Sequence, residues 1–274
     1  MPSKNRKISL IYFIIVTLLL VGLVPLVLTG WMLSNKSGRE LTSAENRYQT
    51  QLVQEKAHQM EMFGKRYGDL VSSVSMALEL SDHLSILSAP ETEQKLGAIL
   101  KQNPDLLALN VKPTSADSLS VFRPEAISRE SITLITTDLE SNLGNQKLLV
   151  SQPQLMDQNG NPLLAFAAPV VINGANVATV VAVTSLKDVA RAIVGMNPTS
   201  QENLWKSGLP IIFVIDQQGK VLFHPDPTLA AAKASLTELK IVQEWQDSNS
   251  QVQSALVPFT AEFDGEKHNM IGAY

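Results

Sequence analysis

The chain has 274 residues, of which 45% are hydrophobic, and a formal net charge of −4. No run of lysines and arginines lies beyond its first few residues, which argues against a nucleic-acid partner. The absence of cysteine excludes a disulfide framework, a thiolate zinc site, a cysteine nucleophile and a lipoprotein anchor.

The first predicted element is an apolar segment, residues 8–33, which has no charged side chain and follows the basic residues Lys4, Arg6 and Lys7. About 20 apolar residues in a helix span a bilayer. A signal peptide has a shorter apolar core of about 7–15 residues and a small-residue cleavage site. We therefore favour a retained transmembrane helix over a cleaved signal. The basic tail, residues 1–7, is expected in the cytoplasm, which places the rest of the chain outside the plasma (inner) membrane of a bacterium.

Residues 34–80 are predicted to form a long amphipathic juxtamembrane helix that continues the span. They contain no proline, and apolar residues recur every three or four positions, as at Leu41, Ala44 and Tyr48. At 1.5 Å per residue the helix would reach about 60–70 Å from the membrane. Two compatible interpretations stay open. The helix packs on its own domain, or its first half also pairs with a second copy in a homodimer.

Residues 81–196 are predicted to form a first α+β module, with antiparallel strands and helices on one side of the sheet. Asn-Gly pairs flanked by apolar runs are a strong hairpin signal, and two occur, at 159–160 and 173–174. Pro169 cannot donate a ladder hydrogen bond, so we expect it at an edge or a bulge. The predicted helices cover about 91–101 and 186–194, and the predicted strands cover 106–111, 118–122, 147–156, 162–172 and 176–184.

A polar, turn-rich stretch at 196–208 predicts a domain boundary, and residues 209–274 repeat a similar pattern. The prediction for this second module is a strand at 211–215, a turn at 216–219, a return strand at 220–223, a helix at about 228–245 and strands at 251–263 and 266–274. The chain stops within the last of these strands. We therefore expect a piece of a longer protein, cut before a second span.

Four stretches, in this order, resemble a known family: Ala-Ala-Pro-Val at 167–170, Asn-Gly at 173–174, the apolar run 180–186, and the strand, acidic-Gly turn, strand and His-Pro end at 211–226. With one span and a long helix before them, they resemble the double Cache sensor domains of bacterial receptors, which hold two PAS-like modules in tandem. The resemblance covers nearly the whole chain. It implies that a small molecule binds the membrane-distal first module and shifts helix position or dimer geometry. The output would be chemotaxis, a histidine kinase, a cyclase or a phosphatase.

One departure bears on the ligand. Family members that bind amino acids share an Arg-x-Trp-Tyr stretch and an aspartate after the last distal strand. Here Arg123 is followed by Pro124 and Glu125, and Thr184 stands near the position of that aspartate. An α-amino group needs a carboxylate partner in a desolvated pocket. An amino-acid ligand is therefore not expected.

Four residues are candidates for ligand binding. Arg123 could hold an anionic group by a bidentate contact, or lie in a surface loop. Ser151, Gln152 and Thr184 fall at strand positions where a PAS-like pocket could open, or serve only in packing. The four histidines are too scattered for a metal site, and no catalytic motif is present, so neither a metal, a cofactor nor an enzymatic activity is expected.

Three functions stay open. The leading one is the extracytoplasmic small-molecule sensor of a transmembrane receptor. The second is a membrane-anchored adaptor that binds another envelope protein, and the third is a degenerate enzyme. An open polar pocket in the first module would favour the sensor, whereas a filled core with an apolar outer patch would favour the adaptor.

Overall fold

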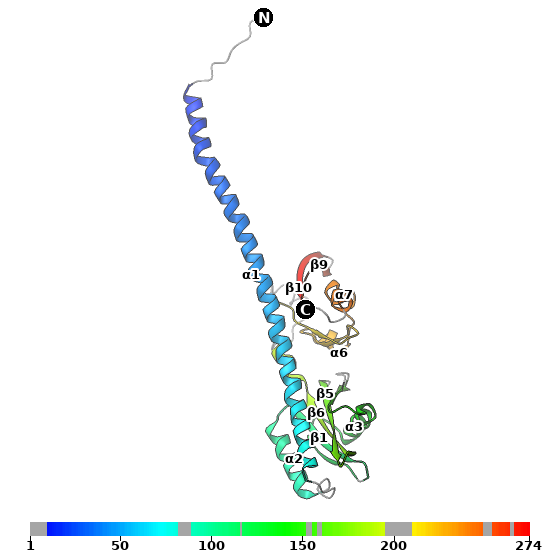
Figure 1. The fold of residues 1–274 in the computed structure, drawn as a ribbon. Coiled ribbons are helices and arrows are strands. Elements are labelled where there is room, and N and C mark those ends of the chain that lie inside the picture. Colours follow the sequence, from blue (N-terminus) through cyan, green and yellow to red (C-terminus); the bar gives the residue numbers. More distant parts are fainter. Residues whose placement is uncertain are drawn as a thin grey trace. The chain divides into compact units, whose positions relative to one another are not determined.

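The computed structural model describes residues 10–81, 89–115, 117–151, 155–157, 161–194, 210–248, 254–263 and 266–274. The chain divides into two units, Met1–Leu52 and Val53–Tyr274. Helix α1, Leu10–Glu79, begins in the first unit and ends in the second (Figure 1). Glu79 lies near the predicted helix end at residue 80, so the continuous juxtamembrane helix is confirmed.

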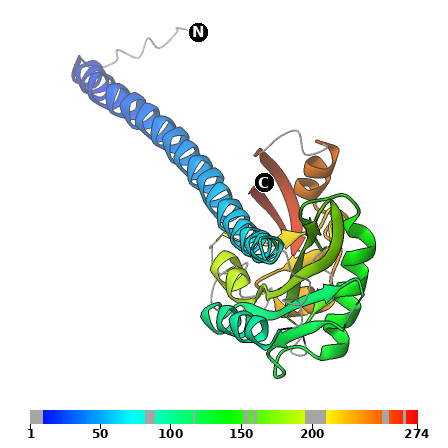
Figure 2. The ribbon, with the colours of Figure 1, turned by 60° about the horizontal axis from the view of Figure 1, so that its bottom comes forward.

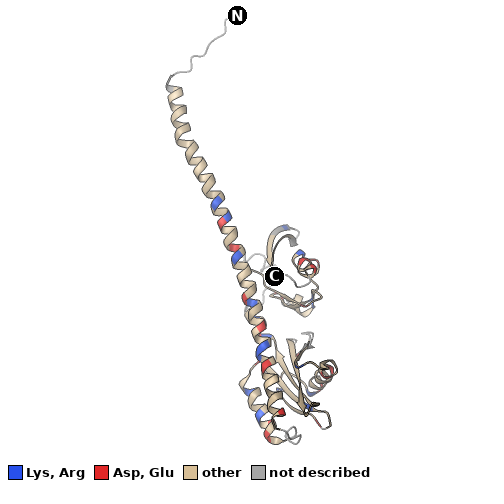
Figure 3. Cartoon of the chain, viewed as in Figure 1, with Lys and Arg blue, Asp and Glu red and all other residues tan. Residues whose placement is uncertain are grey.

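The first unit holds the N-terminal part of α1, which includes its apolar stretch. Large side chains between Tyr12 and Leu33 are exposed, and the helix is long and apolar enough to cross a membrane. Charged side chains of α1 begin only after this stretch (Figure 3). Pro25 lies inside the helix, where a proline removes one backbone donor. The Thr29 hydroxyl donates to the carbonyl oxygens of Pro25 (2.7 Å) and Leu26 (3.1 Å).

After the end of α1, the second unit contains an antiparallel six-stranded sheet of order β2-β1-β6-β5-β3, with β4 also paired to β5. Helices α1 and α2 cover one face and α3 covers the other (Figure 1). This first module is built from α2 (Pro90–Gln102), β1 (Leu106–Pro113), β2 (Leu119–Phe122), α3 (Arg129–Leu143), β3 (Leu149–Val150), β4 (Leu155–Met156), β5 (Pro162–Ile172), β6 (Ala175–Ser185) and α4 (Lys187–Val194).

The central hairpin of this sheet follows the Asn-Gly prediction. Asn173 and Gly174 have φ values of 55° and 81°, so both adopt the left-handed conformation that a tight hairpin turn requires. Pro169 lies on β5 beyond the residues that pair with β3 and β4, next to a register shift at Val170 and Val171. This is the edge-like, bulged position expected for a proline. The Asn159-Gly160 pair lies outside the described residues.

The second module contains two separate two-stranded sheets, β7 with β8 and β9 with β10. Both hairpins contribute to one small core around Ile241, Val242 and Val257. Its elements are β7 (Val214–Ile215), β8 (Val221–Phe223), α6 (Pro227–Ala231), α7 (Lys240–Asp247), β9 (Leu256–Phe263) and β10 (Glu266–Ala273).

Several sequence predictions were wrong in detail. The strand expected at 211–215 covers only Val214–Ile215. Helices were expected on one side of the first sheet, but they cover both faces. The second face is covered by α3, Arg129–Leu143, which was not predicted. The strand expected at 147–156 is two short pieces, β3 and β4. The helix expected at 228–245 is two helices, because the backbone N–H of Leu236 donates to the Gly219 carbonyl and the Ala234 carbonyl accepts from Val221. These bonds to the β7–β8 hairpin replace helical ones.

Candidate ligand-binding site

The two faces of the first sheet are packed differently. On one face α1 and α2 press large side chains together, including Tyr67, Phe166 and Leu109, all fully buried. Under α3 the strands present both large and small side chains, such as Leu163 and Val183 beside Ala165. The α3 face also carries a polar cluster.

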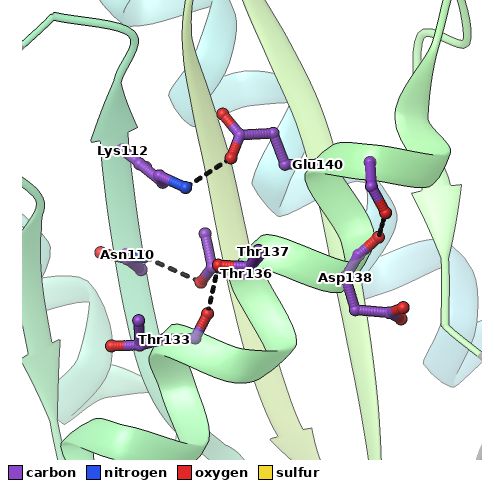
Figure 4. Close-up of polar contacts among 8 residues, drawn as sticks. Asn110, Lys112, Thr133, Thr136, Thr137, Asp138 and Glu140 are labelled. Carbon is purple, nitrogen blue, oxygen red and sulfur yellow. Dashed lines mark hydrogen bonds and ion pairs between the residues drawn. The ribbon is translucent and has the colours of Figure 1, made fainter.

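Asn110 is the centre of this cluster. It lies in the middle of β1 and is 2% exposed. Its amide nitrogen donates to the Thr136 hydroxyl on α3 (2.8 Å), and its amide oxygen accepts from the Ser120 hydroxyl on β2 (2.7 Å). Such a buried amide would cost free energy if left unpaired. The hydrogen bonds therefore fix α3 over the middle of β1 (Figure 4).

Two residues further along β1, Lys112 forms an ion pair with Glu140 of α3 (2.5 Å) (Figure 4). Each side chain is 35% exposed, so this pair faces water. The polar groups between β1 and α3 therefore range from the buried Asn110 amide to the partly exposed Lys112–Glu140 pair. This α3-face cluster, defined as Asn110, Ser120, Thr136, Lys112 and Glu140, can donate and accept hydrogen bonds and offers one charge of each sign.

Arg123 follows β2 and holds two elements together. Its Nε donates to the carbonyl oxygen of Leu106 (3.0 Å). Its Nη2 donates to the carbonyl oxygens of Leu100 (2.9 Å) and Asn103 (3.4 Å). Carbonyls at the end of a helix lack partners within the helix. The guanidinium therefore satisfies the end of α2 and ties it to the start of β1.

Thr184 is fully buried on β6, and its hydroxyl donates to the Leu164 carbonyl of β5 (2.9 Å). Because side chains alternate along a strand, Thr184 faces the same side of the sheet as Val180 and Ala182, which pack on the α1 side. Leu106 is its cross-strand partner on β1 and also accepts from Arg123, so Thr184 and Arg123 lie at the same end of β1.

Ser151 directly follows β3, so it lies at the opposite edge of the sheet from β2 and Arg123. Its hydroxyl accepts from the Ala165 backbone N–H (2.9 Å) and its own N–H donates to the Ala165 carbonyl (2.8 Å). Ser151 thus extends the pairing of β3 with β5, apart from Arg123. Gln152 lies outside the described residues. A ligand-binding role for these four residues stays a prediction.

The α3-face cluster was missed because the helix that supplies Thr136 and Glu140 was not predicted. Its signals were present in the sequence. Ser128 is an N-cap whose hydroxyl accepts from the Ser131 N–H (3.1 Å), and apolar residues recur at helical spacing from Ile132 to Leu143. A second signal was Asn110 itself, a polar residue within an apolar strand.

The polar residues of the second module serve local structure. The Asp226 N–H donates to His224 Nδ1 (2.9 Å), and the Asp226 carboxylate caps α6 through the Thr228 N–H (2.8 Å). Burial lowers the pKa of His224 despite the neighbouring charge of Asp226. Among the described residues, histidine and acidic side chains do not gather in a group of three that could hold a metal ion.

Comparison with solved structures identifies the fold. The sensory domain of the Campylobacter jejuni chemoreceptor Tlp3 with isoleucine bound is similar, with a TM-score of 0.58 and 13% identity over 84% of this chain and 87% of that one. The ligand-binding domain of the Pseudomonas aeruginosa amino-acid chemoreceptor PctC, in complex with GABA, has a TM-score of 0.53 and 17% identity over 82% and 89%. The chain has the fold of a chemoreceptor sensory domain. This confirms the expected α+β architecture, while neither a protein-family model nor a curated protein matches the sequence.

Proposed function

We propose that the chain is the extracytoplasmic small-molecule-sensing part of a bacterial transmembrane receptor. The observation that carries the proposal is the fold, since the Tlp3 domain binds isoleucine and L-valine and the PctC domain binds GABA. The membrane-spanning character of α1 supports it further, because the same helix continues into the core of the first module, where Tyr67 and Val71 are fully buried. The basic residues before the span favour a cytoplasmic N-terminus.

We place the ligand on the α3 face of the first module. The opposite face is sealed by α1 and α2 over large side chains, so a molecule could enter there only by displacing α1. On the α3 face the Lys112–Glu140 pair is open to water and lies two residues along β1 from the buried Asn110. Protein ligand sites combine apolar walls with a few placed polar groups. A small polar ligand with both donors and acceptors fits this set.

The signal would be a population shift. A ligand moves an equilibrium only by its difference in affinity for the two states. Moving a switch from 1:99 to 99:1 takes about 5.5 kcal/mol, which two sites in a homodimer could share. The dimer would form through α1. Leu41 and Tyr48 are exposed and seven residues apart, and Met62 and Met76 are exposed and fourteen apart, which is the spacing of a coiled-coil seam.

The test is a thermal-shift scan of the full chain in detergent micelles against panels of organic acids, amines, sugars and nucleobases. A ligand at about 100 times its Kd stabilises the folded state by about 2.7 kcal/mol. The same scan on Asn110→Ala and on the matched control Asn142→Ala locates the site, since Asn142 is an exposed residue of α3. We expect a hit that Asn110→Ala abolishes and Asn142→Ala preserves. A panel without hits would favour the adaptor function instead.

A further inference from the structure

The outer end of the apolar stretch of α1 changes from apolar to basic within two turns of helix. Leu33 ends the run of large apolar side chains, and Lys36 and Arg39 are the first charged residues of the helix. Helix α1 runs unbroken through this change (Figure 2, blue). About 20 helical residues cross the hydrocarbon core of a bilayer, so a span that begins at Leu10 ends at about residue 30. The two cations therefore follow directly after the point where the helix would leave the hydrocarbon.

Lys36 and Arg39 share one face of α1 with Met32 and Asn35. Residues three or four apart are neighbours on a helix surface, and these four residues are spaced in this way. Together with Trp31 they line an open hollow on the surface of the helix. The exposed fraction is 66% for Trp31 and 65% for Met32. The hollow is therefore apolar on the side toward the span and polar on the side away from it.

The long side chains of this face lean back toward the span. In an α-helix each Cα–Cβ bond tilts toward the N-terminus, so a long side chain covers the turn before its own. Arg39 accordingly lines the same hollow as Thr29, about three turns earlier in the helix. The headgroup layer extends about 5–7 Å beyond the hydrocarbon on each side. Lys36 lies about 9 Å along the helix beyond residue 30, so its leaning side chain reaches this layer.

The protein itself neutralises these two cations only weakly. Lys36 Nζ lies 3.9 Å from Glu40 Oε1, and both side chains are largely exposed, so this pair contributes little. Among the described residues, no carboxylate lies within ion-pair distance of Arg39. Its guanidinium has the geometry to bind a phosphate group through two hydrogen bonds, and Asn35 adds an amide donor. The polar half of the hollow therefore suits a phosphate.

We propose that Lys36 and Arg39, together with Trp31 and Met32, form a binding site for an anionic phospholipid of the outer leaflet. The headgroup phosphate lies between the two cations, and an acyl chain lies on Met32 and along the span. A free phosphate would leave the apolar half of the hollow uncovered, so a lipid fits the site better. The indole of Trp31 suits the boundary between hydrocarbon and headgroups.

The site is compatible with the proposed dimer through α1. Leu41 comes nine residues after Met32, which places the two on opposite sides of the helix, about 180° apart. A second copy packed on Leu41 and Tyr48 would therefore leave the hollow open to lipid. The inference rests on the membrane span of the proposed function and is independent of the sensed ligand. A bound lipid would fix the depth and the rotation of α1 in the bilayer, from which a signal would move it.

The test measures which lipid lies beside Trp31. The full chain with Trp205→Phe and Trp245→Phe keeps one of its three tryptophans and is reconstituted into phosphatidylcholine vesicles. The vesicles contain, at equal mole fraction, either phosphatidylglycerol or phosphatidylcholine with bromine near the headgroup end of its acyl chains. Bromine quenches tryptophan fluorescence only at short range, so the basic tail at the other end of the span does not contribute. We expect stronger quenching by the brominated phosphatidylglycerol.

The preference should depend on the two cations. Each cation near an anionic lipid surface contributes up to about a fivefold preference, so Lys36→Gln/Arg39→Gln should be quenched equally by both lipids. Arg47→Gln is the matched control, because Arg47 is an exposed cation of α1 about 16 Å further along the helix than Lys36. This control should keep the preference. Salt at about 1 M should weaken it, since charges are then screened within about 3 Å.

Two results separate the lipid site from the span. Equal quenching of the unmodified site by both lipids, or an unchanged preference in Lys36→Gln/Arg39→Gln, would overturn the lipid site and leave the span intact. The absence of quenching by either lipid would overturn the site together with the span of the proposed function. If the two phenylalanine substitutions disturb folding, the quenching that Trp31→Phe removes from the chain with all its tryptophans gives the same measure.

Discussion

The two modules differ in the size of their sheets and in how much of each is buried. In the first, a six-stranded sheet is buried on both faces, and the two cores contain fully buried residues such as Tyr67, Phe166 and Ile132. In the second, two separate hairpins contribute to a smaller core around Ile241, Val242 and Val257, and Val221 and Phe223 of β8 are also buried. Isolated two-stranded sheets are marginally stable. We therefore expect the second module to unfold more easily than the first.

The largest expected effect is on the stability of the first module. Phe166 is fully buried between α1 and the sheet, so Phe166→Ala should lower the free energy of unfolding of the first module by about 3–5 kcal/mol. Phe213→Ala is the counterpart in the second module, where the ring is only partly buried, and should cost less. Urea unfolding followed by hydrogen–deuterium exchange separates the modules. A larger loss from Phe213→Ala would reverse the ranking.

The next effect is confined to the second module. A Cβ on Gly272 would lie 2.3 Å from Ile241 Cδ1 and 3.1 Å from the Phe259 ring, so Gly272→Ala should overpack the core at a cost of about 1–3 kcal/mol. Gly97→Ala is the control, since Gly97 lies in α2 with open space around it and the change should stabilise that helix by about 1 kcal/mol. Exchange in β9 and β10 should rise only in the first variant. Faster exchange in the first sheet would show that the modules unfold together.

A third expected effect concerns the α3-face cluster of the first module. Asn110→Ala leaves the Thr136 and Ser120 hydroxyls without their buried partner and should cost about 1–3 kcal/mol. The matched Asn142→Ala should change the free energy of unfolding by less than about 0.5 kcal/mol, because Asn142 is exposed. Chemical denaturation of both variants measures the difference. Equal values would mean that the Asn110 network contributes nothing to holding α3.

The smallest effect concerns the open end of the same cluster. The Lys112–Glu140 pair is one-third exposed, so Lys112→Met should change stability by less than about 1 kcal/mol. Added salt should reduce even that difference, because exposed charges are screened. Thermal unfolding at low and high salt gives the answer. A loss above 2 kcal/mol would place the pair in a drier environment than its exposure indicates.

The features that depend on neighbouring residues could be predicted from the sequence. The apolar run before Leu33 and the helical period after it specified the continuous α1, and Asn173-Gly174 specified the β5–β6 hairpin with both turn residues at positive φ. Gly219, with φ of 77°, likewise closes the turn predicted between β7 and β8. These features are readable because their energetic cause lies within a few residues, in backbone sterics or in the periodic burial of one face.

The features that depend on contacts between residues far apart in the chain could not be predicted from the sequence. Arg123 is held by carbonyls of α2 and β1, which a local pattern could not show. The 228–245 segment broke into two helices because its middle bonds to the β7–β8 hairpin. Asn110 gained its hydrogen-bond partner when α3 brought Thr136 over β1. A hydrogen bond at such positions is set by which groups the fold brings together, and the spacing of residues along the chain does not contain that information.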